Sequence, residues 1–226
     1  MKTANCSSCL LKSKAVENLG DAELKILDQS CVEVIFEKGE TIFKQDALSS
    51  NIIYLQSGLV KLLIKGPKRS QILRIKKAPC YLGLPTTMGD KINHYSAISL
   101  EPTKACFIDI GIFKNLLNLN KEFSYEIIVE LCKNELEQFH RCVTLVQNQI
   151  YGRLVSHLLY MADTVYMANE YDLPMNRNDI ADLICTSRET VSKLLSELDQ
   201  EGIIKVKGKH IQLIDRKRLE EISKNG

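Results

Sequence analysis

Hydrophobic positions along the chain form three successive patterns with different periods. From Cys31 to about Ile110, short runs rich in β-branched and aromatic residues alternate with turns that contain Gly or Pro. Short strands bounded by such turn residues predict an antiparallel sandwich or barrel. The expected strands span residues 32–36, 41–43, 52–55, 59–64, 71–75 and 106–110, and a helix over 21–30 precedes them.

The second pattern is one long helix over residues 122–150, a stretch without Gly or Pro. Its apolar residues recur at alternating spacings of four and three, and this seam consists of Tyr125, Val129, Cys132, Leu136, Phe139, Val143, Val146 and Ile150. A second apolar flank consists of Ile127, Ile128, Leu131, Cys142 and Leu145. The helix could pack only on its own sandwich, but so long a seam favours pairing with a second helix. We expect a parallel homodimer, in which the second flank covers the sheet.

The third pattern begins near Tyr151. A helix over 151–167 is followed by a break at 170–174, by helices over 178–183 and 188–200, and by strands over 203–206 and 210–214. A further helix is expected over 216–223. Two helices, a short turn and a two-stranded hairpin predict a winged helix-turn-helix. The expected class is α+β, with a β-rich domain over 1–121, the long helix over 122–150 and the winged helix over 151–226.

The second helix of this motif carries side chains suited to reading DNA. A recognition helix lays its N-terminal residues against base edges in the major groove. Guanine offers two acceptors to Arg or Lys, and the cytosine amino group donates to Glu. The groove-facing residues would be Arg188, Glu189, Ser192 and Lys193, while Ser187 and Thr190 would hold phosphates. The hairpin lysines Lys205, Lys207 and Lys209 suit phosphate contact.

A purely structural interpretation competes with this one. Thr186 and Glu189 have the spacing of a capping box, in which each side chain satisfies a backbone donor at the helix start. Glu189 would then close the helix, and Arg188 and Lys193 would be solvated. A basic hairpin beside a complete helix-turn-helix favours DNA binding.

Three stretches, residues 186–195, 198–204 and 207–211, resemble the Crp/Fnr family of bacterial transcription regulators. The turns at 38–40, 53–58 and 81–83 resemble that family's cyclic-nucleotide-binding-type β-roll, or jelly-roll, sensor domain, and the long helix resembles its dimerisation helix. The resemblance implies a homodimer that binds double-stranded DNA at a palindromic site and recruits or blocks RNA polymerase. Arg188, Glu189 and Lys193 match the family's base-reading positions, although the family often has Arg in place of Lys193. Ser192 matches a serine of the Fnr branch.

The resemblance also bears on the signal. Family members that bind cyclic AMP carry Gly-Glu-Leu followed downstream by Arg-Ser, and this chain has Gly83-Leu84-Pro85 and Tyr95-Ser96 in their places. Without the arginine, the charge-assisted contact to a cyclic phosphate is lost, so cyclic AMP is not the expected effector. The resemblance instead implies a pocket for an uncharged or planar small molecule, formed by Tyr81, Gly83, Leu84, Tyr95 and Ser96.

The chain has eight cysteines. Cys6 and Cys9 stand where the Fnr branch carries its N-terminal cysteine set, and Cys106 matches that branch's distant ligand. An iron–sulfur cluster needs four thiolates, so Cys31 or Cys80 would have to complete it. Zinc and a redox disulfide are alternatives for the Cys6–Cys9 pair. Small buried hydrophobes are expected at Cys31, Cys106, Cys132, Cys142 and Cys185.

Composition sets limits on the remaining possibilities. Lys and Arg number 30 and Asp and Glu 28, so any DNA affinity must come from clustered charge rather than from a basic chain. No signal peptide or run of eighteen apolar residues is present, which predicts a cytoplasmic protein without membrane contact. Four scattered histidines predict no catalytic or metal site and no enzyme. The alternative function is a small-molecule or redox sensor, or a scaffold, whose winged helix contacts proteins.

Overall fold

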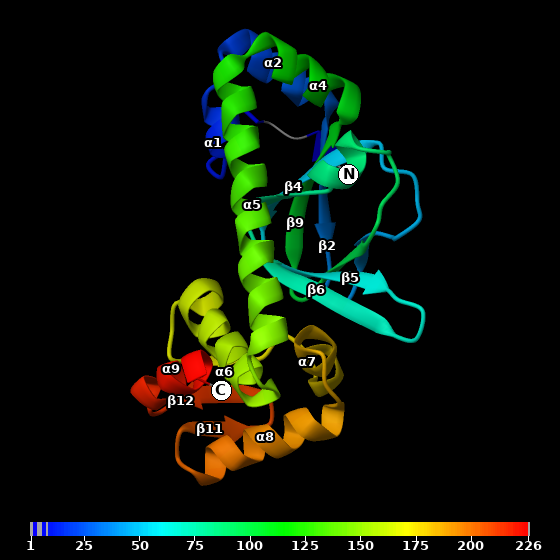
Figure 1. The fold of residues 1–226 in the computed structure, drawn as a ribbon. Helices are drawn as coiled ribbons and strands as arrows, with labels where there is room; N and C mark the ends of the chain where they lie inside the picture. Colours follow the sequence, from blue (N-terminus) through cyan, green and yellow to red (C-terminus); the bar gives the residue numbers. More distant parts are fainter. Residues whose placement is uncertain (1, 4–5, 8, 226) are drawn as a thin grey trace. The chain divides into compact units, whose positions relative to one another are not determined.

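The computed structural model describes residues 2–3, 6–7 and 9–225. They divide into two units, Met1–Leu136 and Glu137–Gly226. The first unit contains two antiparallel sheets with short helices, and the second contains a winged helix (Figure 1). The predicted α+β class, with a β-roll and a C-terminal winged helix-turn-helix, is confirmed.

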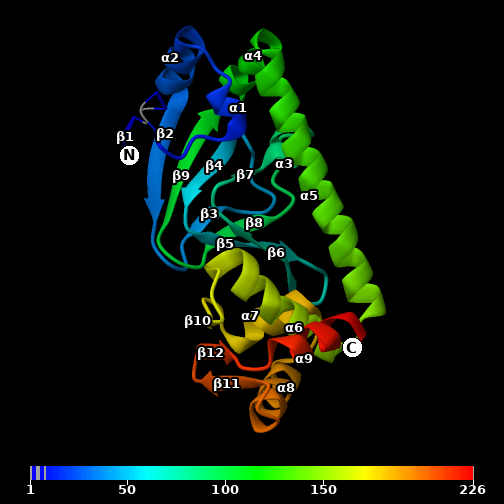
Figure 2. The ribbon, with the colours of Figure 1, turned by 90° about the vertical axis from the view of Figure 1, so that its left-hand side faces the viewer.

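The described residues of the first unit form nine strands in two sheets. The order in the five-stranded sheet is β1–β2–β9–β4–β7, and in the four-stranded sheet it is β3–β8–β5–β6. Figure 2 shows β2, β9 and β4 running side by side. The strand bounds are β1 (Lys2–Thr3), β2 (Cys31–Phe36), β3 (Thr41–Phe43), β4 (Asn51–Ser57), β5 (Leu59–Lys65), β6 (Ser70–Lys77), β7 (Cys80–Leu82), β8 (Ser96–Ser99) and β9 (Thr103–Asp109).

Strand β4 shows how the sequence builds the core. Successive side chains of a strand point to opposite faces. Ile53 and Leu55 join an inner cluster shared with the second sheet, whereas Ile52 and Tyr54 join an outer cluster. Helices α1 (Lys14–Glu17), α2 (Asp21–Ser30) and α4 (Ile110–Leu119) cover the outer cluster. Because both faces are covered, this central strand is apolar almost throughout.

Two further helices complete the first unit. Helix α3 (Leu84–Met88) follows Gly83, whose φ of 80° lies in the left-handed region that favours glycine. Helix α5 (Lys121–Gln147) begins where Asn120 Oδ1 accepts a hydrogen bond of 2.9 Å from the Phe123 backbone N–H. It buries Phe123 and Ile127 in the outer cluster.

Much of the apolar surface of α5 is exposed. Seven of its exposed apolar residues follow one another at spacings of three and four, and we call these seven the α5 row: Tyr125, Ile128, Cys132, Leu136, Phe139, Val143 and Val146. The predicted buried state of Cys132 and Cys142 is therefore wrong for the single chain, because both lie on surfaces that nothing in it covers. Ile128, expected to help cover the sheet, belongs to the row instead.

The second unit is built of helices and one three-stranded sheet of order β10–β12–β11. The remainder of α5 leads into α6 (Ile150–Tyr160), the π-helix η1 (Met161–Tyr166), β10 (Glu170–Asp172), α7 (Arg177–Ile184), α8 (Arg188–Gln200), β11 (Ile204–Lys207), β12 (His210–Leu213) and α9 (Arg216–Asn225).

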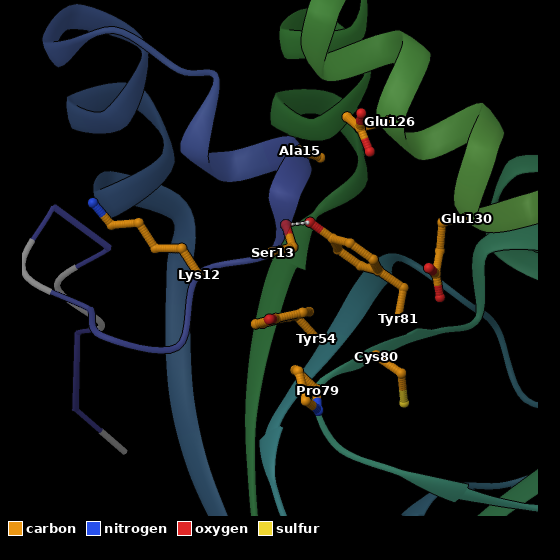
Figure 3. A pocket seen from close by; sticks show the side chains of 9 residues that line it. All are labelled: Lys12, Ser13, Ala15, Tyr54, Pro79, Cys80, Tyr81, Glu126 and Glu130. Carbon is orange, nitrogen blue, oxygen red and sulfur yellow. Dashed lines mark hydrogen bonds between the residues drawn. The ribbon is translucent and has the colours of Figure 1, made fainter. Parts of the chain in front are cut away.

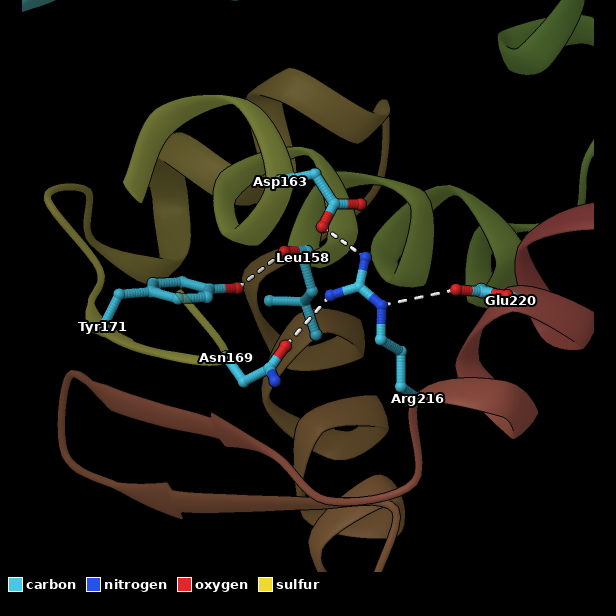
Figure 4. Close-up of polar contacts among 6 residues, drawn as sticks. All are labelled: Leu158, Asp163, Asn169, Tyr171, Arg216 and Glu220. Atoms are coloured by element: carbon cyan, nitrogen blue, oxygen red, sulfur yellow. Dashed lines mark hydrogen bonds and ion pairs between the residues drawn. The ribbon is translucent and has the colours of Figure 1, made fainter. Parts of the chain in front are cut away.

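Polar contacts fix the ends of this scaffold (Figure 4). The Arg216 guanidinium donates to the Asp163 carboxylate, to Asn169 Oδ1 at 2.9 Å and to Glu220 Oε1 at 3.3 Å. The buried Tyr171 hydroxyl donates to the Leu158 carbonyl at 2.7 Å. These contacts join α9, η1, β10 and α6 into one support for the helix-turn-helix.

Several predicted bounds need correction. The long helix ends at Gln147 and Ile150 starts α6, because Asn148 and Gln149 leave the helical path. The last predicted strand of the β-roll ends at Asp109, whose carboxylate caps α4. Strands β1, β7, β8 and β10 were not predicted.

Candidate nucleic-acid interface

The helix-turn-helix is shaped by the caps of its two helices. Asn176 Oδ1 accepts from the Asp179 backbone N–H at 2.9 Å and starts α7. Cys185 ends α7 in the left-handed region, with φ of 61°. Ser187 caps α8, accepting a hydrogen bond of 3.2 Å from the Thr190 backbone N–H. The predicted capping position of Thr186 is therefore wrong by one residue, because Thr186 still belongs to the turn.

Packing decides which side of α8 faces outward. Val191, Leu195 and Leu198 are buried. On α7, Ile180, Ala181, Leu183 and Ile184 are buried. The four predicted base-reading residues, Arg188, Glu189, Ser192 and Lys193, are all exposed. The structure thus brings them together on the outward side of the first two turns of α8.

These four residues differ in the contacts that they make within the protein. The pKa of Glu189 is lowered by its own backbone N–H and by the Ser187 hydroxyl, so this exposed carboxylate helps to hold the helix start. Ser192 Oγ donates to the Arg188 carbonyl at 3.0 Å, which leaves its lone pairs to accept. Lys193 Nζ lies 3.7 Å from Glu197 Oε1, an exposed pair of the kind that stabilises little. Glu189 therefore combines capping with exposure, and Ser192 offers an acceptor.

The wing places its three lysines in different roles. Lys205 Nζ lies 3.3 Å from Asp199 Oδ1, and the same oxygen accepts from the Val206 backbone N–H at 3.0 Å. Asp199 thus ties β11 to α8. Lys207 and Lys209 flank Gly208 at the wing tip, are exposed, and form no ion pair with the described residues. The charges of Lys207 and Lys209 are available to a partner, whereas the charge of Lys205 is partly neutralised by Asp199.

A pocket of about 400 Å³ lies between the start of α7, the start of α8 and the wing turn. Three of its lining residues are cationic: Arg177, Arg188 and Lys209. Arg177 Nη2 donates to the Gly208 carbonyl at 3.1 Å, so Arg177 holds the wing turn. Its buried Nη1 has no hydrogen-bond partner among the described residues, and burial lowers the pKa of its guanidinium. The pocket is therefore a concentrated positive site.

Sequence reasoning missed Arg177, Asn176 and Asp199. A signal for the first two was present, since Asn176 and Asp179 have the spacing of a capping box and place Arg177 in the first helical turn. The contact of Arg177 with Gly208 joins residues 31 positions apart, which no local pattern reveals.

The predicted effector residues of the β-roll are dispersed. Tyr81 and Leu84 belong to the outer core cluster and Tyr95 packs against the inner one. The Gly83 backbone N–H donates to Tyr95 Oη at 3.3 Å, and Ser96 Oγ accepts from the Gln45 backbone N–H at 2.9 Å.

A small cavity of about 90 Å³ in the first unit includes only Tyr81 of that set (Figure 3). The Tyr81 hydroxyl is hydrogen-bonded to Ser13 Oγ at 2.7 Å. Glu126 and Glu130 of α5 line the same cavity. Burial raises the pKa of Tyr81, so its phenol stays neutral.

The cysteines of the first unit are divided among different surroundings, since Cys80 lies in the inner cluster and Cys132 is exposed. Cys6, Cys31 and Cys106 lie in the outer core cluster, and Gln56 Nε2 lies 3.5 Å from Cys9 Sγ. Among residues 2–3, 6–7 and 9–225, no three His, Cys, Asp or Glu side chains are arranged to hold a metal ion. The residues present do not fit an iron–sulfur cluster.

Comparison with known proteins agrees with this geometry. Residues 152–222 match the Crp-like helix-turn-helix domain, and residues 33–120 match the cyclic nucleotide-binding domain. The fumarate and nitrate reduction regulatory protein of Vibrio cholerae is 25% identical over 97% of this chain and 90% of its own length. The nitrogen fixation regulation protein FixK of Bradyrhizobium diazoefficiens is 26% identical over 96% of this chain and 93% of its own.

The solved structure of FixK2 from Bradyrhizobium japonicum has the same fold, with a TM-score of 0.77 and 21% identity over 85% of this chain and 96% of that one. A β-roll followed by a winged helix with an exposed recognition surface defines a DNA-binding transcription regulator. The chain belongs to the Crp/Fnr family of these regulators. None of the helices that the described residues form has the length and hydrophobicity to span a bilayer.

Proposed function

We propose that this regulator binds a palindromic operator as a homodimer, in the cytoplasm, and acts there on RNA polymerase. The supporting observation is the recognition surface, where Arg188, Glu189, Ser192 and Lys193 face outward beside a basic pocket. Arg188 would read guanine through its two acceptors, and Glu189 and Ser192 would accept from amino groups of bases.

The phosphate backbone would be held on both sides of this surface. Arg177 and Lys209 line the pocket with Arg188, and a phosphate there would pair with the unsatisfied Nη1 of Arg177. Lys207 extends the contact along the wing, and Ser187 and Thr190 lie at the start of α8, where an anion is favoured. Lys205 would add less, since Asp199 already engages it.

The proposed homodimer interface is the α5 row. Large apolar side chains with exposed fractions of 56% at Leu136 and Phe139 and 77% at Val146 follow a heptad spacing. A second copy of α5 would bury them as knobs in facing holes. Two copies would then present two recognition helices, and half-sites one helical turn apart, about 34 Å, would let both dock.

The regulator would respond to a signal other than cyclic AMP at its first unit. Leu84 and Tyr95 stand where charged nucleotide contacts would be needed, and both pack into apolar clusters. We propose no catalytic residue and no resident cofactor. A sensor whose winged helix contacts only proteins is the competing function, and the basic pocket favours DNA over it.

Selection from a random duplex pool tests the proposal. The wild-type protein should enrich an inverted repeat with half-site centres about 10 base pairs apart. The double variant Arg188→Ala/Lys193→Ala should lose that enrichment while its fold, followed by circular dichroism, is unchanged. Ser196→Ala, two turns further along α8, is the matched control and should select the same repeat. A wild-type protein that retains no duplex, or a double variant that still selects the repeat, would contradict the assignment.

A further inference from the structure

Two arginines from outside the helix-turn-helix close the C-terminal end of α7. The last four carbonyls of a helix have no partner within that helix. Arg141 of α5 donates from Nη2 to the Leu183 carbonyl at 2.7 Å, and Arg153 of α6 donates from Nη1 to the Ile184 carbonyl at 3.3 Å. Leu183 and Ile184 are buried residues, so the arginines supply donors where water has little access. Their positive charges also suit the negative end of the helix dipole.

Arg153 also holds the break between the two preceding helices. Its Nε donates to the Asn148 carbonyl at 2.9 Å, at the point where α5 has ended and α6 has not yet begun. Asn148 Nδ2 in turn donates to the Ser223 carbonyl of α9 at 3.0 Å. One planar guanidinium therefore joins the α5–α6 junction to the end of α7, and α9 holds that junction from another side.

The end of α7 lies directly before the recognition helix. Only Cys185 and Thr186 stand between Ile184 and Ser187, the residue that caps α8. The Thr186 backbone N–H donates to the Ala181 carbonyl at 2.9 Å, so the turn is folded back on α7. A turn this short leaves little freedom between two helices, and the direction of α8 follows from the position of the end of α7.

We propose that Arg153 and Arg141 are positioning residues for DNA recognition. They hold the last carbonyls of α7 and thereby fix the orientation of the first turns of α8, which carry Arg188 and Glu189. The inference rests on the proposed function, because it assigns a purpose to that orientation. Both arginines act through backbone carbonyls and not through a contact of their own with DNA.

The geometry of Arg153 can be separated from its charge. Its two hydrogen bonds leave from two nitrogens of one rigid, planar group, whereas a lysine offers a single nitrogen on a flexible stem. The variant Arg153→Lys therefore keeps the charge near the helix end but should satisfy only one of the two carbonyls. If the charge alone matters, through the helix dipole, the lysine should restore the wild-type behaviour.

Hydrogen exchange in the free, full-length protein tests the contact without DNA. Arg153→Lys should speed the exchange of the Thr186, Thr190 and Val191 amides, which are hydrogen-bonded in and after the turn, by about tenfold. Amides of the wing, residues 204–213, should change by less than about twofold. Wild-type exchange at Thr186 in this variant, or an equal acceleration in the wing, would overturn the proposal.

Ser156→Ala is the matched control. It lies on the same helix, α6, and loses the 2.7 Å hydrogen bond between Ser156 Oγ and Ser223 Oγ of α9, without a contact to α7 being removed. The control should leave exchange at Thr186 as in the wild type. The same acceleration in Ser156→Ala would show that any weakening of α6 loosens the turn, and would contradict a specific role of Arg153.

Binding to two duplexes then tests the consequence for recognition. Arg153→Lys should weaken binding to the selected operator by about tenfold, but binding to an unrelated duplex of equal length by less than about twofold, because nonspecific affinity depends on surface charge, which is unchanged. Ser156→Ala should keep the wild-type ratio of the two affinities. A variant that is merely less stable loses affinity for both duplexes alike, and that result for Arg153→Lys would contradict positioning.

Arg141→Gln extends the test to the neighbouring carbonyl, and it decides the matter if Arg153→Lys does not fold. It removes the 2.7 Å bond to Leu183 and should give the same selective pattern with a smaller factor. Wild-type exchange at Thr186 in Arg141→Gln would contradict its assignment. A wild-type protein that retains no duplex would overturn the proposed function, and hydrogen exchange alone would then decide whether these arginines fix the turn.

Discussion

The winged helix exposes charged side chains at its candidate binding surface, whereas the β-roll packs apolar and aromatic side chains at its candidate effector positions. In the winged helix, Arg188, Lys207 and Lys209 are exposed on a scaffold held by caps and by the Asp199 contacts. In the β-roll, Leu84 lies in the outer apolar cluster, and Tyr95 is partly buried and packs against the inner one. From this contrast we propose that the winged helix provides the DNA-binding surface and that the β-roll does not respond to a cyclic nucleotide. The predictions below test that division.

A charged substitution in the α5 row should reduce operator affinity more than any other change proposed here. Phe139→Asp places a charge in the proposed dimer seam, where burial without a partner is costly. Without the second copy, the operator is bound by one recognition helix, and linked sites commonly gain about 100-fold or more over single ones. Affinity for the selected operator should fall by at least that factor, measured by fluorescence anisotropy, and sedimentation should show a monomer.

Thr144→Asp is the control for the seam, because Thr144 lies on the same helix but outside the α5 row. It should remain dimeric and bind with nearly wild-type affinity. A Phe139→Asp protein that stays dimeric at micromolar concentration would show that the row pairs with something other than a second copy.

Acid should destabilise the winged helix through His157. This ring is buried, its Nε2 has no hydrogen-bond partner among the described residues, and burial, with a smaller effect of Arg141, lowers its pKa to about 4. The unfolded chain takes up the proton near pH 6.5, so the free energy of unfolding falls as the pH drops from about 6.5 to about 4, by roughly 3 kcal/mol in total. Urea unfolding at several pH values should show this decline.

The variant His157→Leu isolates the effect, since it removes the titrating group and fills a similar space. Its stability should vary less with pH than that of the wild type across the same interval. Equal slopes for the two proteins would mean that other groups cause the acid sensitivity.

Sequence patterns predicted the elements best where local chemistry sets them. The bounds predicted for α8, residues 188–200, are those of the structure, because Ser187 caps the start and Gly202 follows the end. The break before α6 was predicted between residues 150 and 151 but lies at Asn148 and Gln149, which are not strong helix breakers. Contacts distant in sequence were also missed, such as the hydrogen bond between Arg177 and Gly208. Hydrophobic periodicity shows which face of a helix or strand is buried, but it does not show which other element packs against that face.

The roles of Arg177 and Lys205 should differ on DNA. Arg177→Gln removes a pocket cation and the hydrogen bond to the wing turn, so affinity should fall by a similar, several-fold factor for every duplex, and the salt slope by about one unit. Lys205→Gln should change both quantities less, because Asp199 already engages that ammonium. Binding isotherms at several salt concentrations measure both. If Lys205→Gln has an equal or larger effect, the protein contacts DNA near Lys205 on β11 rather than at the pocket beside α7.

The smallest effect is expected in the β-roll, at Tyr95. Tyr95→Phe removes the acceptor for the Gly83 backbone N–H, a bond of 3.3 Å, while the ring keeps its contact with Phe43 at 5.4 Å. The free energy of unfolding should fall by about 1 kcal/mol. Operator affinity should change by less than about twofold, and cyclic AMP should alter it in neither protein, because Leu84 and Tyr95 provide no charge to pair with a cyclic phosphate. Tyr171→Phe, which removes the 2.7 Å bond to the Leu158 carbonyl, makes the same chemical change in the winged helix and should destabilise at least as much. If Tyr95→Phe shifts operator affinity tenfold while Tyr171→Phe does not, the Gly83–Tyr95 contact transmits a signal, and the division between the two units is drawn in the wrong place.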